Sequence, residues 1–196
     1  MPFAEDPQAN LLILETMVAE LEDYLHSDEL FRQLVVQAPD KTYMPRMTIG
    51  LMLEHVDHLE KILSELGPDE RIRLEEAMDR LHEIRDAELE AYATMLRREM
   101  KSHLDSWSWY LDGCADGDED CPDNYPSEVW LRTRLEEVVQ EARNREIPVV
   151  DELARLQELD RSLDDMFQRG DYVGPKDRSS DYAQDRFWWL YGMPIV

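Results

Sequence analysis

Residues 69–112 contain neither glycine nor proline and read DERIRLEEAMDRLHEIRDAELEAYATMLRREMKSHLDSWSWYLD. Gly67 and Pro68 precede this stretch, and Gly113 follows it. A continuous helix of this length would be roughly 65 Å long, which exceeds the diameter of a small domain. Such a helix has to pack against several partners in turn or project from the body. We therefore predict an all-α fold, an irregular bundle of about six helices around one long central helix.

The apolar residues of this stretch fall into two series. The first fits one helical face: Leu74, Ala77, Leu81 and Ile84. The second also has helical spacing: Leu89, Tyr92, Leu96, Met100, His103, Trp107 and Leu111. The step of five between Ile84 and Leu89 shifts the apolar stripe around the helix. We expect a change of packing partner near residues 85–88, or a kink there.

Shorter amphipathic segments flank the long stretch. Apolar spacing predicts a helix ending near Leu25, a short helix from Ser27 to Val35, and a third helix capped by Thr48 that ends at Gly67. Residues 113–126 read as a loop. A helix should then start at Ser127 and break near residues 147–148, and a last helix should cover residues 149–167. The first 31 residues hold eight acids and no Lys or Arg, so the first helix should carry a negative strip.

The C-terminal residues 171–196 lack a long periodic stripe but hold six of the chain's 17 aromatic residues. A disordered tail would rarely be so aromatic. We expect the tail to fold back across the bundle, which gives a single domain over residues 1–196 with the bundle in 1–170 and the tail in 171–196. In the alternative, the tail anchors a partner protein.

The formal charge of −24, from 21 Lys and Arg against 45 Asp and Glu, limits the classes of partner. Such a surface repels nucleic acid and anionic membranes, so we expect no direct binding to either. It is compatible with a basic protein partner, with cations, or simply with solubility. The N-terminus shows no signal peptide, and no apolar run is long enough to span a membrane. A cytoplasmic location is the default expectation.

One loop resembles a metal site. Asp116, Asp118 and Asp120 alternate like the first ligands of an EF-hand calcium loop, and Glu128 stands one residue beyond the position of its last acid. The sixth position, normally glycine, is Cys121. A calcium site at residues 116–120 with Glu128 is therefore the alternative to a solvated acidic loop.

Cysteines and histidines offer weaker signals. Cys114 and Cys121 bracket the acidic loop and could close it by a disulfide in an oxidising compartment. We expect reduced thiols, and not zinc ligands, because no nearby His or CxxC supplies further ligands. His55 and His58 lie on one predicted helix, and Asp79 and His82 lie on the next. They could form a carboxylate–histidine metal site, but we expect solvated histidines at the edge of the core.

No catalytic signature appears, so the chain is not predicted to be an enzyme and no cofactor is expected. In size and helical class it is similar to the helical maturation chaperones of molybdoenzymes, whose characteristic motif it lacks. We predict a protein-binding adaptor or regulator that engages another protein, and the acidic surface favours a basic partner. The candidate anchors are aromatic: Trp107, Trp109, Phe187, Trp188, Trp189 and Tyr191. Two alternatives are a metal-binding protein and a homo-oligomer in which the long helices pair.

Overall fold

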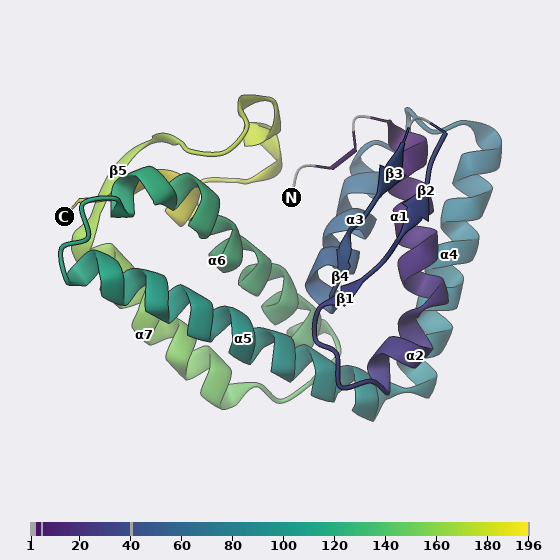
Figure 1. Ribbon diagram of the computed structural model, residues 1–196, viewed down its shortest axis with the longest axis horizontal. Helices are drawn as coiled ribbons and strands as arrows, with labels where there is room; N and C mark the ends of the chain where they lie inside the picture. Colours follow the sequence, from purple (N-terminus) through teal and green to yellow (C-terminus); the bar gives the residue numbers. More distant parts are fainter. Residues whose placement is uncertain (1–2, 5, 40, 196) are drawn as a thin grey trace. The chain divides into compact units, whose positions relative to one another are not determined.

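The computed structural model, which describes residues 3–4, 6–39 and 41–195, is mostly helical with little sheet (Figure 1). The all-α class is therefore confirmed. The chain divides into two compact units, Met1–Glu99 and Met100–Val196. The boundary falls inside α5 (Leu89–Ala115), which contributes residues to both units. The prediction that residues 1–196 form a single domain stays a prediction.

The first unit contains four further helices: α1 (Pro7–Ala19), α2 (Leu21–Leu25), α3 (Ile49–Lys61) and α4 (Pro68–Ala87). The α1 helix is almost entirely apolar on its inner face and packs against both α3 and α4. Thr48 caps α3 as predicted, because its hydroxyl accepts the Leu51 N–H at 3.1 Å. The Gly67 N–H donates to the Glu70 carboxylate at 2.7 Å, so Gly67 marks the start of α4.

The predicted short helix from Ser27 to Val35 is wrong, because the segment leads into two small antiparallel strand pairs. Strand β1 (Arg32–Gln33) pairs with β4 (Arg46–Met47), and β2 (Val36–Gln37) pairs with β3 (Thr42–Tyr43). Leu34 is buried, Val35 is 58 % exposed and Val36 is buried again. This alternation has the period of a strand, and β-branched residues favour that conformation.

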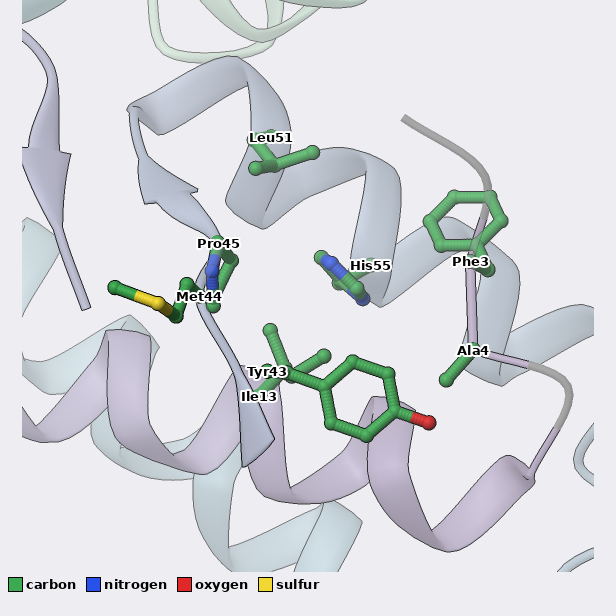
Figure 2. A pocket seen from close by; sticks show the side chains of 8 residues that line it. All are labelled: Phe3, Ala4, Ile13, Tyr43, Met44, Pro45, Leu51 and His55. Carbon is green, nitrogen blue, oxygen red and sulfur yellow. The ribbon is translucent and has the colours of Figure 1, made fainter. Parts of the chain in front are cut away.

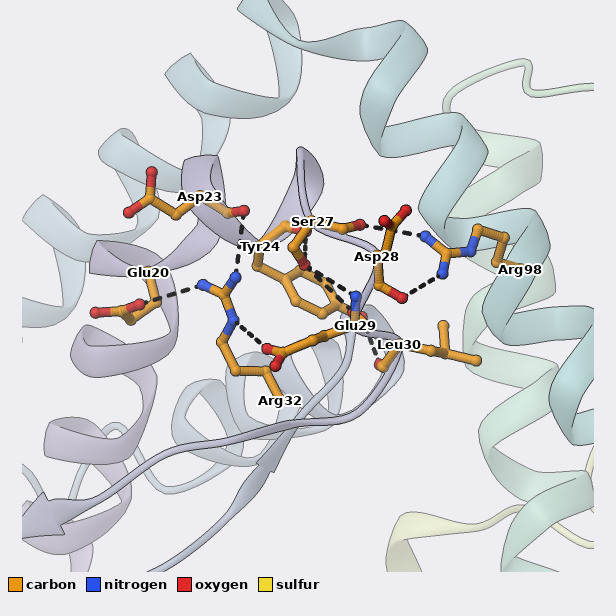
Figure 3. Close-up of polar contacts among 9 residues, drawn as sticks. All are labelled: Glu20, Asp23, Tyr24, Ser27, Asp28, Glu29, Leu30, Arg32 and Arg98. Carbon is orange, nitrogen blue, oxygen red and sulfur yellow. Dashed lines mark hydrogen bonds and ion pairs between the residues drawn. The ribbon is translucent and has the colours of Figure 1, made fainter.

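The turn before β1 is held by polar contacts that replace the expected helical hydrogen bonds (Figure 3). The hydroxyl of Tyr24 donates to the carbonyl of Leu30 at 2.9 Å. From α5, the guanidinium of Arg98 donates to the carbonyl oxygens of Ser27 and Asp28 at 3.3 and 2.7 Å. These hydrogen bonds tie the carbonyl groups of the turn to side chains of α2 and α5, so they stabilise the turn.

The negative strip expected on the first helix is largely paired with arginines. Arg73 of α4 binds both carboxylate oxygens of Glu15, with its Nε at 2.8 Å from one of them. Arg80, also on α4, pairs with Glu22 at 2.7 Å. Arg32 of β1 pairs with Glu20 at 3.3 Å (Figure 3). Arginines distant in sequence thus neutralise an acidic face that looks unpaired in the sequence.

The long helical stretch is not continuous. It divides at Glu88 into α4 and α5, at the last residue of the range 85–88 where a kink was predicted. The first apolar series is buried throughout, and so is the second apart from its first member: Leu89 is 44 % exposed. Leu89 is the first residue of α5, directly after the break at Glu88. Helical spacing counted across that break therefore predicted a buried position for a side chain that is exposed.

In the second unit, α5 is followed by α6 (Cys121–Asn144) and α7 (Val150–Met166). The predicted loop at 113–126 is wrong at both ends, because only residues 116–120 separate the two helices. Pro122 lies in the first turn of α6, where its missing N–H removes no helical bond, and Pro126 lies inside the helix. The two prolines had indicated a loop where the chain starts a helix instead.

The described part of the tail packs within the second unit. Strand β5 (Phe167–Tyr172) pairs antiparallel with β6 (Tyr191–Pro194), and short 3₁₀ helices cover Lys176–Asp181 and Trp188–Leu190. Gly192 has φ 145°, and a Cβ atom there would lie 2.2 Å from the carbonyl oxygen of Gln168. The strand pairing therefore requires glycine at this position. Throughout the described residues, no helix combines the length and apolarity needed to cross a membrane.

Candidate functional site

The most exposed large apolar side chain among the described residues is Trp109 on α5, at 81 %. Trp107, two residues earlier, is fully buried. The structure thus separates the two tryptophans as helical geometry demands: one serves the core and the other lies at the surface. A large exposed aromatic side chain is typical of a binding anchor, because its burial by a partner releases water from a wide apolar surface.

Acidic residues flank Trp109 along one face of α5 and directly after the end of that helix. Asp105, Asp112 and Asp116 stand four residues before it, three after it and seven after it, and all three are exposed. These spacings place them in one row along the helix surface. Arg155 of α7 approaches Asp105 at 2.5 Å, so the acid at this end of the row is paired. We name the row Asp105, Trp109, Asp112 and Asp116 the Trp109 face.

A disulfide fixes the end of this face. Cys114 and Cys121 are bonded, with their Cα atoms 5.3 Å apart, and join the last turn of α5 to the first residue of α6. The expectation of reduced thiols is therefore wrong. No sequence pattern favoured pairing, but α5 extends through Cys114 and α6 begins at Cys121, which brings the two thiols together. The hydroxyl of Tyr110 donates to the Cys121 carbonyl at 2.7 Å, and burial raises the Tyr110 pKa.

The acidic loop does not assemble the predicted calcium ligands. The carboxylate of Asp118 accepts the N–H of Asp120 at 3.0 Å, while Asp116 and Asp120 are exposed and Glu128 lies two turns into α6. Among the described residues, no group of three or more His, Cys, Asp or Glu side chains is arranged to hold a metal ion. These carboxylates instead serve the turn and the acidic surface.

The histidines of the predicted carboxylate–histidine site likewise do not lie together. His82 is exposed on α4, whereas His55 on α3 is only 4 % exposed. The expectation that His55 is solvated is wrong, because the β3–β4 turn and the N-terminal segment cover it. Burial, and to a lesser degree the charge of His58, lowers the His55 pKa to about 3.

The tail aromatics occupy the interior more than the surface. Phe187 and Trp189 are 4 % and 2 % exposed, and Trp188 and Tyr191 are half-buried. The indole of Trp189 donates to the Thr133 hydroxyl at 3.1 Å and lies 3.7 Å from the guanidinium carbon of Arg132. Of the six aromatic anchor candidates, Trp109 alone is fully presented to solvent.

Sequence reasoning missed Arg132, the charged residue that contacts Trp189. Arg132 binds both oxygens of Asp160 at 2.7 and 2.9 Å while it stacks on Trp189. The signal in the sequence was the spacing of Arg132, which stands three residues from both Val129 and Leu135 and therefore shares their buried helix face. Comparison of the chain with models of protein families, with curated proteins and with solved structures found no match.

Proposed function

We propose that the protein is a non-catalytic adaptor or regulator that binds a basic protein segment through the Trp109 face. The observation that carries this proposal is the 81 % exposure of Trp109 within a row of aspartates. An exposed indole contributes nothing to the core of its own chain, so its burial by a partner is the simplest source of binding energy.

The charges around Trp109 favour a cationic partner. Between Lys101 and Arg132 the chain has eight acids and no Lys or Arg. An arginine of the partner could stack on the indole while its guanidinium hydrogen bonds to Asp112 or to Asp116. Acidic surfaces of this kind also accelerate encounter with basic partners, an effect that salt screens. The overall charge of −24 disfavours nucleic acid as the ligand.

The disulfide supports the same proposal. It connects the helix that carries Trp109 to α6 at the position where the row of acids ends. A site held by rigid elements loses less conformational entropy on binding than a flexible loop does. The homo-oligomer stays a prediction. On residues 100–115 Trp109 is the only exposed large apolar side chain, which leaves no continuous apolar strip for pairing of long helices.

The experiment compares four proteins in pull-downs from the native host lysate at low and moderate salt, followed by titration of the purified partner. They are wild type, Trp109→Ala, the double variant Asp112→Asn/Asp116→Asn, and the control Ile72→Ala. Ile72 is also an exposed apolar residue, at 55 %, but it lies on α4 in the other unit.

We expect Trp109→Ala to weaken the partner's binding at least about thirtyfold, as loss of a hot-spot tryptophan does. The double variant should weaken binding at low salt and reduce its dependence on salt. Ile72→Ala should bind like wild type. A partner that binds Trp109→Ala as tightly as wild type would contradict the proposal.

A further inference from the structure

The two strand pairs of the first unit form one antiparallel ribbon (Figure 1). The register has the same offset in both pairs, so Val35 and Met44, which lie between the pairs, stand opposite each other. The N–H of Leu34 donates to the carbonyl of Pro45 at 3.0 Å and continues the ladder there. The ribbon is therefore one continuous surface element.

Side chains alternate between the two sides of a strand, which gives the ribbon an inner and an outer side. Figure 2 shows the side chains of Tyr43 and Met44 pointing to opposite sides of their strand. The inner side is buried or half-buried and consists of Leu34, Val36, Tyr43, Pro45 and Met47. The outer side, which we name the ribbon face, is exposed and consists of Gln33, Val35, Gln37, Thr42, Met44 and Arg46.

Apolar side chains are concentrated on and beside the ribbon face. Val35 and Met44 are 58 % and 60 % exposed and form a cross-strand pair. Phe31, directly before β1, is 45 % exposed and continues the alternation. Three of the ten exposed large apolar side chains among the described residues therefore come from residues 31–44. An exposed apolar cluster rimmed by polar residues is typical of an interaction site.

Arg46 lies on the ribbon face next to this apolar pair and opposite Gln33. Elsewhere in the first unit arginines bind acids, as Arg73 binds Glu15. Arg46, in contrast, is exposed and forms no ion pair or side-chain hydrogen bond with any described residue. Its planar guanidinium therefore keeps its donors for a carboxylate of a partner.

The sequence around the ribbon is basic, although the whole chain has a net charge of −24. Residues 30–53 hold three Lys and Arg against one acid, Asp40, which lies outside the described residues. Lys41 lies at the end of the ribbon, with its Nζ atom 4.7 Å from the centre of the Tyr43 ring. Physiological salt screens charges beyond about 8 Å, so a short ligand responds to this local charge more than to distant acids.

Side-chain hydrogen bonds hold the ribbon in shape. The side-chain amide of Gln33 donates to the carbonyls of Met44 and Pro45 at 2.6 and 3.0 Å. The hydroxyl of Thr42 donates to the amide oxygen of Gln37 at 2.8 Å. A surface that is already ordered loses little conformational entropy when it binds a partner.

We propose that the ribbon face binds a segment of another protein that carries a carboxylate between apolar side chains. The carboxylate pairs with the guanidinium of Arg46, and the apolar side chains cover Val35 and Met44. The ribbon face lies in the unit that does not carry Trp109, and the inference does not depend on the proposed function. An anionic membrane is a poorer match, because its charge extends over a wide area and meets the net charge of −24.

The test is titration of the full chain with three synthetic peptides, followed by nuclear magnetic resonance. The first is Ser-Leu-Ser-Glu-Ser-Leu-Gly with both ends blocked, which has its glutamate and leucines on one side when it is extended. The other two carry glutamine or lysine in place of the glutamate. The readouts are the methyl shifts of Val35 and Met44 and the Nε–H shift of Arg46. We expect saturable shifts, with the glutamate peptide binding about fivefold more tightly than the glutamine peptide and the lysine peptide binding most weakly.

Two variants assign the contacts. Arg46→Gln should remove the preference for the glutamate peptide, and Met44→Ser should weaken the binding of all three peptides. The matched controls are Arg161→Gln on α7 and Ile72→Ser on α4, both at exposed positions, and they should bind like wild type.

Three results would overturn the inference. The first is equal binding of the glutamate and lysine peptides to wild type, or shifts that do not saturate with either. The second is binding to phosphatidylserine vesicles that Met44→Ser abolishes, which would assign the ribbon face to a membrane. The third is a monomer–dimer equilibrium in sedimentation that Met44→Ser abolishes, which would assign it to a second copy of the chain. The peptide comparison on wild type decides the matter without any variant.

Discussion

The carboxylate of Glu99 accepts the backbone N–H of Gly50 with both of its oxygens, at 3.0 and 3.1 Å. Gly50 lies in the first turn of α3, where N–H groups have no partner within the helix. Glu99 is fully buried on α5, at the end of the first unit. Glu99 therefore supplies the acceptor that an N–H group in the first turn of α3 lacks, although it lies 49 residues further along the chain. The same contact fixes α3 against α5.

Replacement of Glu99 should destabilise the first unit. Glu99→Ala leaves the Gly50 N–H buried without its acceptor and should lower the free energy of unfolding by about 1–3 kcal/mol. Glu99→Gln keeps one acceptor oxygen and should cost less. Urea denaturation measures both, with Glu90→Ala on the exposed side of α5 as the control. Equal midpoints for Glu99→Ala and Glu90→Ala would show that the contact contributes nothing.

The tail should be essential for the stability of the second unit. Trp189→Ala removes a buried indole together with its contacts to Arg132 and Thr133, and should cost about 3–5 kcal/mol. Trp188→Ala, at the half-buried neighbour, should cost clearly less. Guanidinium titration followed by circular dichroism gives both values. If the two variants were equally stable, the tail would not pack as described.

This dependence also bears on how partner binding is tested. A chain truncated after Gly170 would lose Phe187, Trp189 and Leu190 from the core together. Loss of a partner from such a chain would report unfolding as readily as loss of an anchor. Single substitutions at exposed positions separate the two effects.

The disulfide should stabilise the junction of α5 and α6. Loop-closure entropy for a cysteine separation of seven residues predicts that Cys114→Ser/Cys121→Ser lowers the free energy of unfolding by about 2–3 kcal/mol. The thermal midpoint of wild type should fall after reduction, whereas that of the double variant should not respond to reductant. Two titratable thiols in unfolded wild-type protein purified without reductant would contradict the pairing.

The buried histidine should make the protein sensitive to acid. The His55 pKa is about 3 in the folded chain and near its ordinary 6.5 in the unfolded chain. Below pH 6.5 the unfolded state takes up a proton that the folded state excludes. The stabilisation is therefore complete above pH 6.5 and is lost as the pH falls toward 3.

Free energies of unfolding measured across this range should fall more steeply for wild type than for His55→Phe. The exposed His82 serves as the control, because His82→Gln should keep the wild-type slope. Parallel curves for wild type and His55→Phe would show that His55 is protonated as easily in the folded protein as in the unfolded one.

Helical periodicity was enough to predict the class and most of the core. The series from Leu74 to Ile84 and from Tyr92 to Leu111 is buried as its spacing indicates, because repeated apolar spacing reports one face of a helix directly. Thr48 also marks a helix start correctly, since capping depends on neighbouring residues alone. The predicted end of that helix at Gly67 is wrong, because α3 ends at Lys61 and Gly67 instead precedes α4.

The wrong predictions concern segments whose conformation depends on residues distant in the sequence. Arg98 holds the turn at Ser27 and Asp28 from 70 positions away, and nothing local announces it. Pro122 and Pro126 suggested a loop, but Pro122 lies in the first turn of α6, where proline is tolerated, and the helix continues past Pro126. The candidate site was found only in part. Helical geometry predicted that Trp107 and Trp109 would separate, but which of them is exposed depends on packing against other elements.

Gly192 offers a way to find relatives of this chain. Any side chain there would collide with the Gln168 carbonyl while the backbone holds φ at 145°. Descendants of a common ancestor that keep the β5–β6 pairing should therefore retain glycine at this position, even where the surrounding aromatic residues have exchanged. A glycine two residues before a proline, 26 residues beyond the end of α7 at Met166, is a signature that tolerates divergence elsewhere.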